Sequence, residues 1–179
     1  MLIDDFIPRY DFQEQHERVI DAPPEVVRKA VERWRPSSSP LWRVLLLLRG
    51  LGRTRGTLRE WAEGAGFLRL AEDEAEVVYG QAGRFWALRE RAAMASPRTV
   101  EEFRRFDDAG AAVAVMNLRY DAVAGGRTRV STETRIRALS AGARRRFRLY
   151  WTLIRPFSGL LRRSMLRGIE AEAKSLRSG

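Results

Sequence analysis

The chain has 179 residues, of which 45% are hydrophobic and 31% charged, with a formal net charge of +10. These values fit one domain over residues 1–179, with 1–11 as an N-terminal extension, and exclude a disordered chain or a membrane bundle. The absence of cysteine excludes disulfide scaffolds, thiolate metal sites and a cysteine nucleophile. Residues 1–12 lack the continuous apolar run of a secretory signal, so we expect a cytoplasmic protein.

The first part of the chain predicts one strand followed by two helices. Residues 11–20 form the strand, and a helix over 23–34 follows, since proline suits a first turn and Glu25 suits the positive end of the helix dipole. The leucine-rich segment 41–51 is too short to span a membrane. It predicts a second helix that is either largely buried or dips into a surface.

Residues 57–139 predict an antiparallel sheet. Turn residues separate strand candidates at 66–70, 75–86, 100–106, 112–123 and 128–139, and Gly125-Gly126 suits a tight hairpin because glycine accepts positive φ. In 112–123, even-numbered residues such as Met116 share one face, while Asn117 and its odd-numbered neighbours share the other. The same period of two in 128–139 predicts a sheet with one wet face.

Residues 140–179 predict one long amphipathic helix. At about 100° per residue, an apolar stripe falls within one arc of the helix. Its members are Phe147, Tyr150, Trp151, Ile154, Phe157, Leu161, Met165, Ile169 and Leu176. Because the stripe keeps its phase across Pro156, we expect one bent helix rather than two. The segment holds ten basic residues against two glutamates, a local excess of +8.

The order of these elements resembles the START-like superfamily, also called SRPBCC, which includes lipid-transfer and polyketide cyclase proteins. The resemblance rests on the step from strand to helix at 17–27, with its Ala22-Pro23-Pro24-Glu25-Val26 sequence, and on the closing strand 128–136 running into the last helix. It covers about residues 12–175. It implies an α+β helix-grip fold, in which a curved antiparallel sheet wraps around the long C-terminal helix, with two shorter helices after the first strand. It also implies an apolar cavity between sheet and helix.

Candidate ligand-binding residues are those expected to face that cavity. They combine apolar walls with a few hydroxyl groups, as small-molecule sites do. They are Trp61 and Phe67 from the first edge of the sheet, Tyr79, Phe85, Met116, Leu118, Tyr120, Thr132 and Thr134 from its strands, and Tyr150, Trp151 and Ile154 from the helix. Each of these side chains alone equally fits a filled core.

Three function classes stay open. The first is a carrier or sensor of a small hydrophobic molecule such as a lipid, sterol or polyketide. The second is a cyclase or dehydratase acting in the same cavity, although His16 is the sole histidine and the sequence has no recognisable catalytic set. The third is binding of the basic C-terminal helix to an anionic membrane surface or, less favoured, to nucleic acid. We predict no metal or cofactor, and no pattern defines an oligomeric state.

Overall fold

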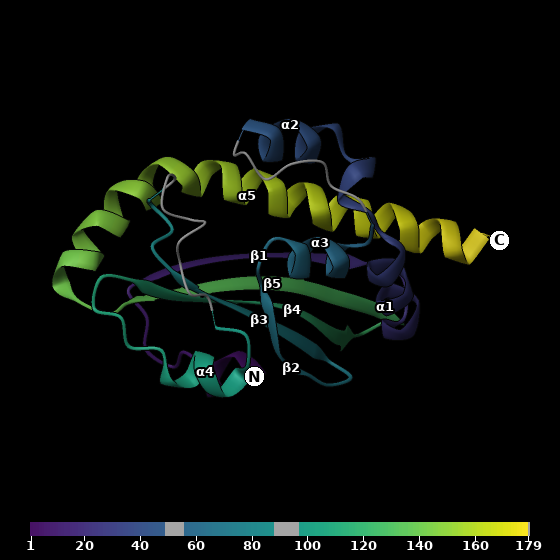
Figure 1. The fold of residues 1–179 in the computed structure, drawn as a ribbon. Helices are drawn as coiled ribbons and strands as arrows, with labels where there is room; N and C mark the ends of the chain where they lie inside the picture. The colour runs from purple at the N-terminus through teal and green to yellow at the C-terminus, as the bar shows by residue number, and fades with distance from the viewer. Residues whose placement is uncertain (49–55, 88–96, 179) are drawn as a thin grey trace. The chain divides into compact units, whose positions relative to one another are not determined.

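The computed structural model describes residues 1–48, 56–87 and 97–178. This part of the chain is an α+β protein with a five-stranded antiparallel sheet and a long C-terminal helix (Figure 1). The strand order is β1-β5-β4-β3-β2. The strands are β1 (Phe12–Ile20), β2 (Leu68–Glu72), β3 (Glu76–Gly83), β4 (Ala112–Val123) and β5 (Arg127–Ala138).

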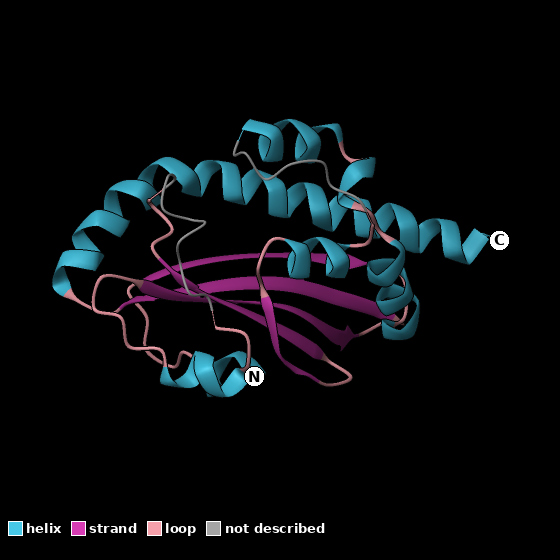
Figure 2. Cartoon of the chain, in the orientation of Figure 1, coloured by secondary structure: helices cyan, strands magenta, loops and turns pink. Residues whose placement is uncertain are grey.

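Helices precede, interrupt and follow the strands (Figure 2). Among the described residues, the α-helices are α1 (Pro24–Arg33), α2 (Pro40–Leu48), α3 (Leu58–Gly64), α4 (Val100–Arg105) and α5 (Ala141–Ser178), and the 3-10 helices are η1 (Leu2–Asp5) and η2 (Pro36–Ser38). The end of the predicted 41–51 helix lies outside the described residues. No helix within them is both long enough and apolar enough to cross a membrane.

The elements form two compact units, each built from three stretches of chain. Unit 1 comprises Met1–Gln15, Gly66–Leu118 and Glu133–Pro156, and unit 2 comprises His16–Ala65, Arg119–Thr132 and Phe157–Gly179. Strands β1, β4 and β5 and helix α5 contribute residues to both units.

The hairpin and the C-terminal helix follow the sequence predictions. Strand β4 has the predicted bounds, and Gly125 and Gly126 adopt φ of +79° and +68° in the turn before β5. Helix α5 runs without interruption through Pro156. One long helix is therefore confirmed.

The antiparallel sheet predicted over residues 57–139 is wrong in two places, because the chain forms the capped helices α3 and α4 there. The predicted strand 100–106 is instead the helix α4, Val100–Arg105, and the Thr99 side chain accepts a hydrogen bond from the Glu102 backbone. Helix α3 was not predicted at all. Thr57 caps it with a reciprocal capping box to Glu60. These side-chain caps satisfy backbone N–H groups that have no partner in the first helical turn.

The predicted wet face of the sheet is covered in unit 1. Residues Val78, Val113 and Val115 of this face pack with Ile3, Ile7 and Phe103 in one buried core. Residues 1–11, expected to form an extension, therefore contribute two fully buried isoleucines to unit 1. In Figure 1 the N-terminus and α4 lie below the sheet, whereas α5 begins beside the left end of the sheet and rises above it.

Two close contacts in the structure require glycine. A Cβ atom on Gly80 would lie 2.5 Å from Leu70 Cδ1 and 2.8 Å from Phe103, so the missing side chain of β3 makes room for α4. In unit 2, a Cβ atom on Gly168 of α5 would lie 2.0 Å from Trp34 Nε1.

Tryptophan side chains join three helices in unit 2. The rings of Trp34 and Trp42 meet edge to face at 5.4 Å, and those of Trp42 and Trp61 at 5.0 Å. Trp42 Nε1 also donates to the Leu161 carbonyl at 3.0 Å. Trp34 and Trp42 are each 4% exposed, so these ring contacts are part of the buried core of unit 2.

We predict that Gly168→Ala lowers the free energy of unfolding by about 1–3 kcal/mol, because the new methyl group overlaps the Trp34 ring. Gly142→Ala is the matched control in the same helix, since its nearest atom, Ser140 Oγ, is 3.8 Å away. The control should stay within about 1 kcal/mol of the parent protein. Urea unfolding measures both, and equal effects would contradict the packing argument.

Candidate functional site

The alternation of β3, β4 and β5 assigns the side chains of unit 1 to two faces. Val78, Val113 and Val115 pack against the N-terminal segment, whereas Ala112, Ala114 and Ile136 pack against α5. By the period of two, Tyr79, Met116 and Thr134 share the face toward α5. We call this the helix-facing face and the opposite one the N-terminal face.

Phe147 of α5 is the centre of an aromatic cluster on the helix-facing face. It is 2% exposed and packs with Ala112 and Ile136 of the sheet. Its ring centroid lies 4.9 Å from Phe12, 5.7 Å from Tyr150 and 5.8 Å from Trp151, whose ring is stacked at 25°. The rings of Phe85 and Trp86 meet it edge to face at 6.2 and 6.1 Å. These separations are typical of favourable ring contacts.

The other side chains around Phe147 are only half-buried. They are Phe12, Phe85, Trp86, Tyr150 and Trp151, and the half-buried Tyr79, Met116 and Ile154 belong to the same unit. Two polar side chains of the helix-facing face are more deeply buried: Glu14, 6% exposed, and Thr134, 9% exposed. Glu14 follows Phe12 by two residues in β1 and therefore points to the same side.

The structure divides the sequence-predicted ligand residues between the two units. Unit 1 holds Phe67, Tyr79, Phe85, Met116, Leu118, Thr134, Tyr150, Trp151 and Ile154. Unit 2 holds Trp61, Tyr120 and Thr132. Trp61 lies in helix α3 and contacts Trp42, so its expected position on a sheet edge is wrong. Thr132 Oγ1 accepts a hydrogen bond from Arg162 at 2.6 Å.

The prediction of an apolar stripe on α5 that packs on the sheet is correct in part. Phe147, Met165 and Ile169 are buried, but Phe157 is 48% exposed. Sequence reasoning also missed Phe12, Glu14 and Trp86 as members of the helix-facing face. The period of two from Phe12 to Glu14 was the available signal, but a buried glutamate does not stand out from exposed ones by sequence alone.

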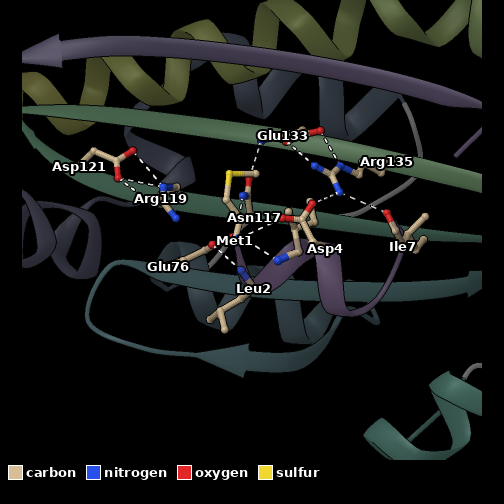
Figure 3. Close-up of polar contacts among 11 residues, drawn as sticks. Met1, Leu2, Asp4, Ile7, Glu76, Asn117, Arg119, Asp121, Glu133 and Arg135 are labelled. Carbon is tan, nitrogen blue, oxygen red and sulfur yellow. Dashed lines mark hydrogen bonds and ion pairs between the residues drawn. The ribbon is translucent and has the colours of Figure 1, made fainter. Parts of the chain in front are cut away.

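The N-terminal face of unit 1 carries a buried polar network (Figure 3). The Glu76 carboxylate, 1% exposed, accepts hydrogen bonds from the Leu2 and Ile3 backbone amides at 2.8 and 3.3 Å and from Asn117 Nδ2 at 2.7 Å. Asn117 Oδ1 in turn accepts from the Glu133 backbone at 2.7 Å. The network therefore connects the N-terminal segment to β3, β4 and β5.

An ion-pair chain continues this network toward η1. Arg135, 7% exposed, donates to Glu133 Oε1 and to Asp4 Oδ1, both at 2.6 Å. Burial alone would lower the pKa of Arg135, but hydrogen bonds to Glu133 and Asp4 raise it overall. The Arg135 hydrogen bond, with a contribution from the N-terminal amine, lowers the pKa of Asp4. Both shifts favour the charged forms of Asp4 and Arg135, whose ion pair attaches the N-terminal segment to β5.

Within the described ranges, no group of three or more histidine, cysteine, aspartate or glutamate side chains is arranged to hold a metal ion. The buried polar network lies on the N-terminal face, away from the aromatic cluster.

Comparison with known proteins finds matches among solved structures. No family model and no curated protein matches the chain. The crystal structure of TTHA0849 from Thermus thermophilus aligns over 92% of this chain and 99% of its own, at 13% identity and a TM-score of 0.34.

We predict that Glu76→Ala destabilises the protein by about 1–3 kcal/mol, because two buried donors and one partly buried donor lose their acceptor. Hydrogen exchange of the Leu2 and Ile3 amides should accelerate more than exchange in β4. Glu101→Ala is the control, since this exposed glutamate pairs with Arg105 on the surface of α4 and should change stability by less than about 0.5 kcal/mol. Unchanged exchange at the N-terminus in Glu76→Ala would contradict the tethering role.

The lowered pKa of Asp4 predicts a defined pH dependence. A depressed pKa stabilises the fold above the ordinary value of 3.8, and this contribution is lost as pH falls through the folded-state value. Asp4→Asn should therefore be less stable than the parent at neutral pH, and the difference should shrink below about pH 4. Urea unfolding at a series of pH values tests this. Asp5→Asn keeps the Arg135 ion pair and should show a smaller loss at neutral pH.

Proposed function

We propose that the protein binds a small hydrophobic molecule between the sheet and the first half of α5, as a carrier or sensor. The observation that supports this is the half-buried aromatic cluster around Phe147. Five aromatic rings gather on one fully packed phenylalanine while keeping part of their surface accessible. A lipid-, sterol- or polyketide-like ligand would cover that remaining apolar surface and gain hydrophobic free energy.

The same proposal includes the helix-grip fold as the specific architecture of the chain. Strand β1, helices α1 to α3, strands β2 to β5 and the long helix α5 follow one another, with α4 between β3 and β4. This order resembles the helix-grip fold of START-like proteins, with α3 and α4 in addition to the two shorter helices expected from the resemblance. In that fold the ligand lies between sheet and closing helix. The aromatic cluster of unit 1 involves α5 and the sheet at the corresponding place in the chain order.

The aromatic composition indicates which ligands are favoured. Flat ring systems stack on Trp151 and Tyr150 with more specific geometry than a flexible acyl chain does. Glu14 and Thr134 are the buried polar side chains expected on the helix-facing face, so a hydroxyl-bearing ligand fits better than a purely hydrocarbon one. A carboxylate acceptor and a threonine hydroxyl would fix the orientation of such a ligand.

Binding without chemistry is favoured over a cyclase or dehydratase activity. Among the described residues, the buried ionisable groups are Glu14, Glu76, Glu133 and Arg135. Glu76, Glu133 and Arg135 are on the N-terminal face and bond to one another or to the N-terminal segment, which leaves Glu14 as the one on the helix-facing face. General acid–base catalysis needs its proton donor or acceptor within hydrogen-bond reach of the substrate. These three groups are therefore structural.

The proposal predicts that native mass spectrometry detects a 1:1 complex with at least one of three probes: oleic acid, cholesterol or naringenin. Met116→Trp, which adds bulk to the helix-facing face, should weaken binding by about tenfold or more. Val19→Trp is the control, because Val19 is a strand residue that is 43% exposed. The proposal fails if none of the probes binds and nothing copurifies, or if Met116→Trp binds as tightly as the parent while remaining folded.

A further inference from the structure

We propose that the outer face of α5 in unit 1, from Arg145 to Arg155, docks on the surface of an anionic lipid bilayer. We call it the leucine–arginine face. It is the side of the helix turned away from Phe147 and the sheet.

The first observation is a pair of exposed leucines. Leu149 is 76% exposed and Leu153 is 67% exposed, and their spacing of four residues places them on one side of the helix, one turn apart. Thr152, beside them, donates its hydroxyl to the Arg148 carbonyl at 3.0 Å, so this polar group is satisfied within the helix. The centre of the leucine–arginine face is therefore an apolar surface exposed to solvent.

The second observation is the charge around the leucines. Residues Ala141–Pro156 contain five arginines and no acidic residue. Arg144 pairs with Asp11 at 2.8 Å. The other four, Arg145, Arg146, Arg148 and Arg155, are exposed. At 100° per residue, Arg145 and Arg146 lie within about 60° of Leu149, one turn before it.

An anionic bilayer matches both features at once. An interfacial helix inserts apolar side chains at the boundary between headgroups and acyl chains, while its basic residues meet lipid phosphates. Arginine suits this position, because its guanidinium group forms bidentate hydrogen bonds with phosphate and its alkyl stem lies along the apolar region.

Two other occupants fit less well. Nucleic-acid contacts use arginine on phosphate but leave two protruding leucines without an apolar partner. A second copy of the chain packing through the same face would bring arginine clusters together with no acidic residue of this helix segment to neutralise them. The proposal does not depend on ligand binding, because the leucine–arginine face is opposite the aromatic cluster.

Vesicle flotation tests the proposal. The full chain should bind vesicles of 70% phosphatidylcholine and 30% phosphatidylglycerol but not pure phosphatidylcholine vesicles, and binding should fall as salt is raised. The double variants Leu149→Ala/Leu153→Ala and Arg145→Gln/Arg146→Gln should each reduce the partition coefficient by about tenfold. All four positions are exposed, so the fold should survive, and circular dichroism verifies it.

Matched controls change the same chemistry elsewhere. Arg9→Gln/Arg98→Gln removes two exposed positive charges outside α5, and Val19→Ala shortens an exposed apolar side chain. Both should bind anionic vesicles within about twofold of the parent protein, allowing for the small change in net charge. Native mass spectrometry of the α5 variants with the ligand probes keeps the two proposals separate, since ligand binding should be unchanged.

Three outcomes would overturn docking on a bilayer. The first is a parent protein that does not float with anionic vesicles. The second is binding that the leucine variant retains in full while a single-stranded oligonucleotide competes for it, which would indicate a polyanion site. The third is concentration-dependent self-association in analytical ultracentrifugation that only the leucine variant abolishes, which would indicate a second copy.

Discussion

The burial of the Glu76 carboxylate is the constraint on which the organisation of unit 1 depends. A polar side chain that is 1% exposed is tolerated only where hydrogen-bond partners replace water. Two of those partners are backbone amides of the N-terminal segment and the third is Asn117. The N-terminal segment is thus fixed at a position that also places Ile3 and Ile7 over the valines of β3 and β4. The hydrogen bonds to Glu76 and the burial of Ile3 and Ile7 therefore require the same path of the N-terminal segment.

The strongest elements were predictable because their signals are local. The period of two in 112–123 and 128–139 defines strands, and adjacent glycines at 125 and 126 define the turn between them. The stripe of α5 likewise gives a helix whose length the structure reproduces. The resulting α+β class with an antiparallel sheet was therefore correctly predicted.

The errors have physical causes of two kinds. Helices α3 and α4 begin with Thr57-x-x-Glu60 and Thr99-x-x-Glu102, and this capping pattern was present in the sequence but outweighed by nearby turn residues. The covered N-terminal face was not predictable in the same way. Asn117 is polar in a period-two pattern, so it indicates a wet face. Its partners, Glu76 and Glu133, are 41 and 16 residues away, and only the folded chain shows them.

In the candidate site, too, local sequence patterns predicted some residues, whereas the contacts among them depend on residues far apart in the chain. Tyr150 and Trp151 were predictable from the stripe on α5, and Met116 from the alternation of β4. Phe147 was in the stripe as well, but its role as the contact point for rings from β1, from the residues after β3 and from α5 itself depends on tertiary packing. The aromatic cluster could therefore be anticipated as a set of apolar residues, though not as a half-open ring of side chains around one buried phenylalanine.

The leucines on the outer side of α5 need a reason beyond helix formation. Leucine, arginine, lysine, glutamine and glutamate have similar helix propensities, so an exposed position gains nothing in helix stability from leucine. Single exposed apolar residues are common on protein surfaces and do not by themselves indicate an interaction site. Leu149 and Leu153 differ because they occupy successive turns within a segment otherwise rich in arginine. Arginine alone would keep this surface soluble, and leucine alone would favour self-association. The combination is typical of a helix that meets water, phosphate and hydrocarbon at one boundary.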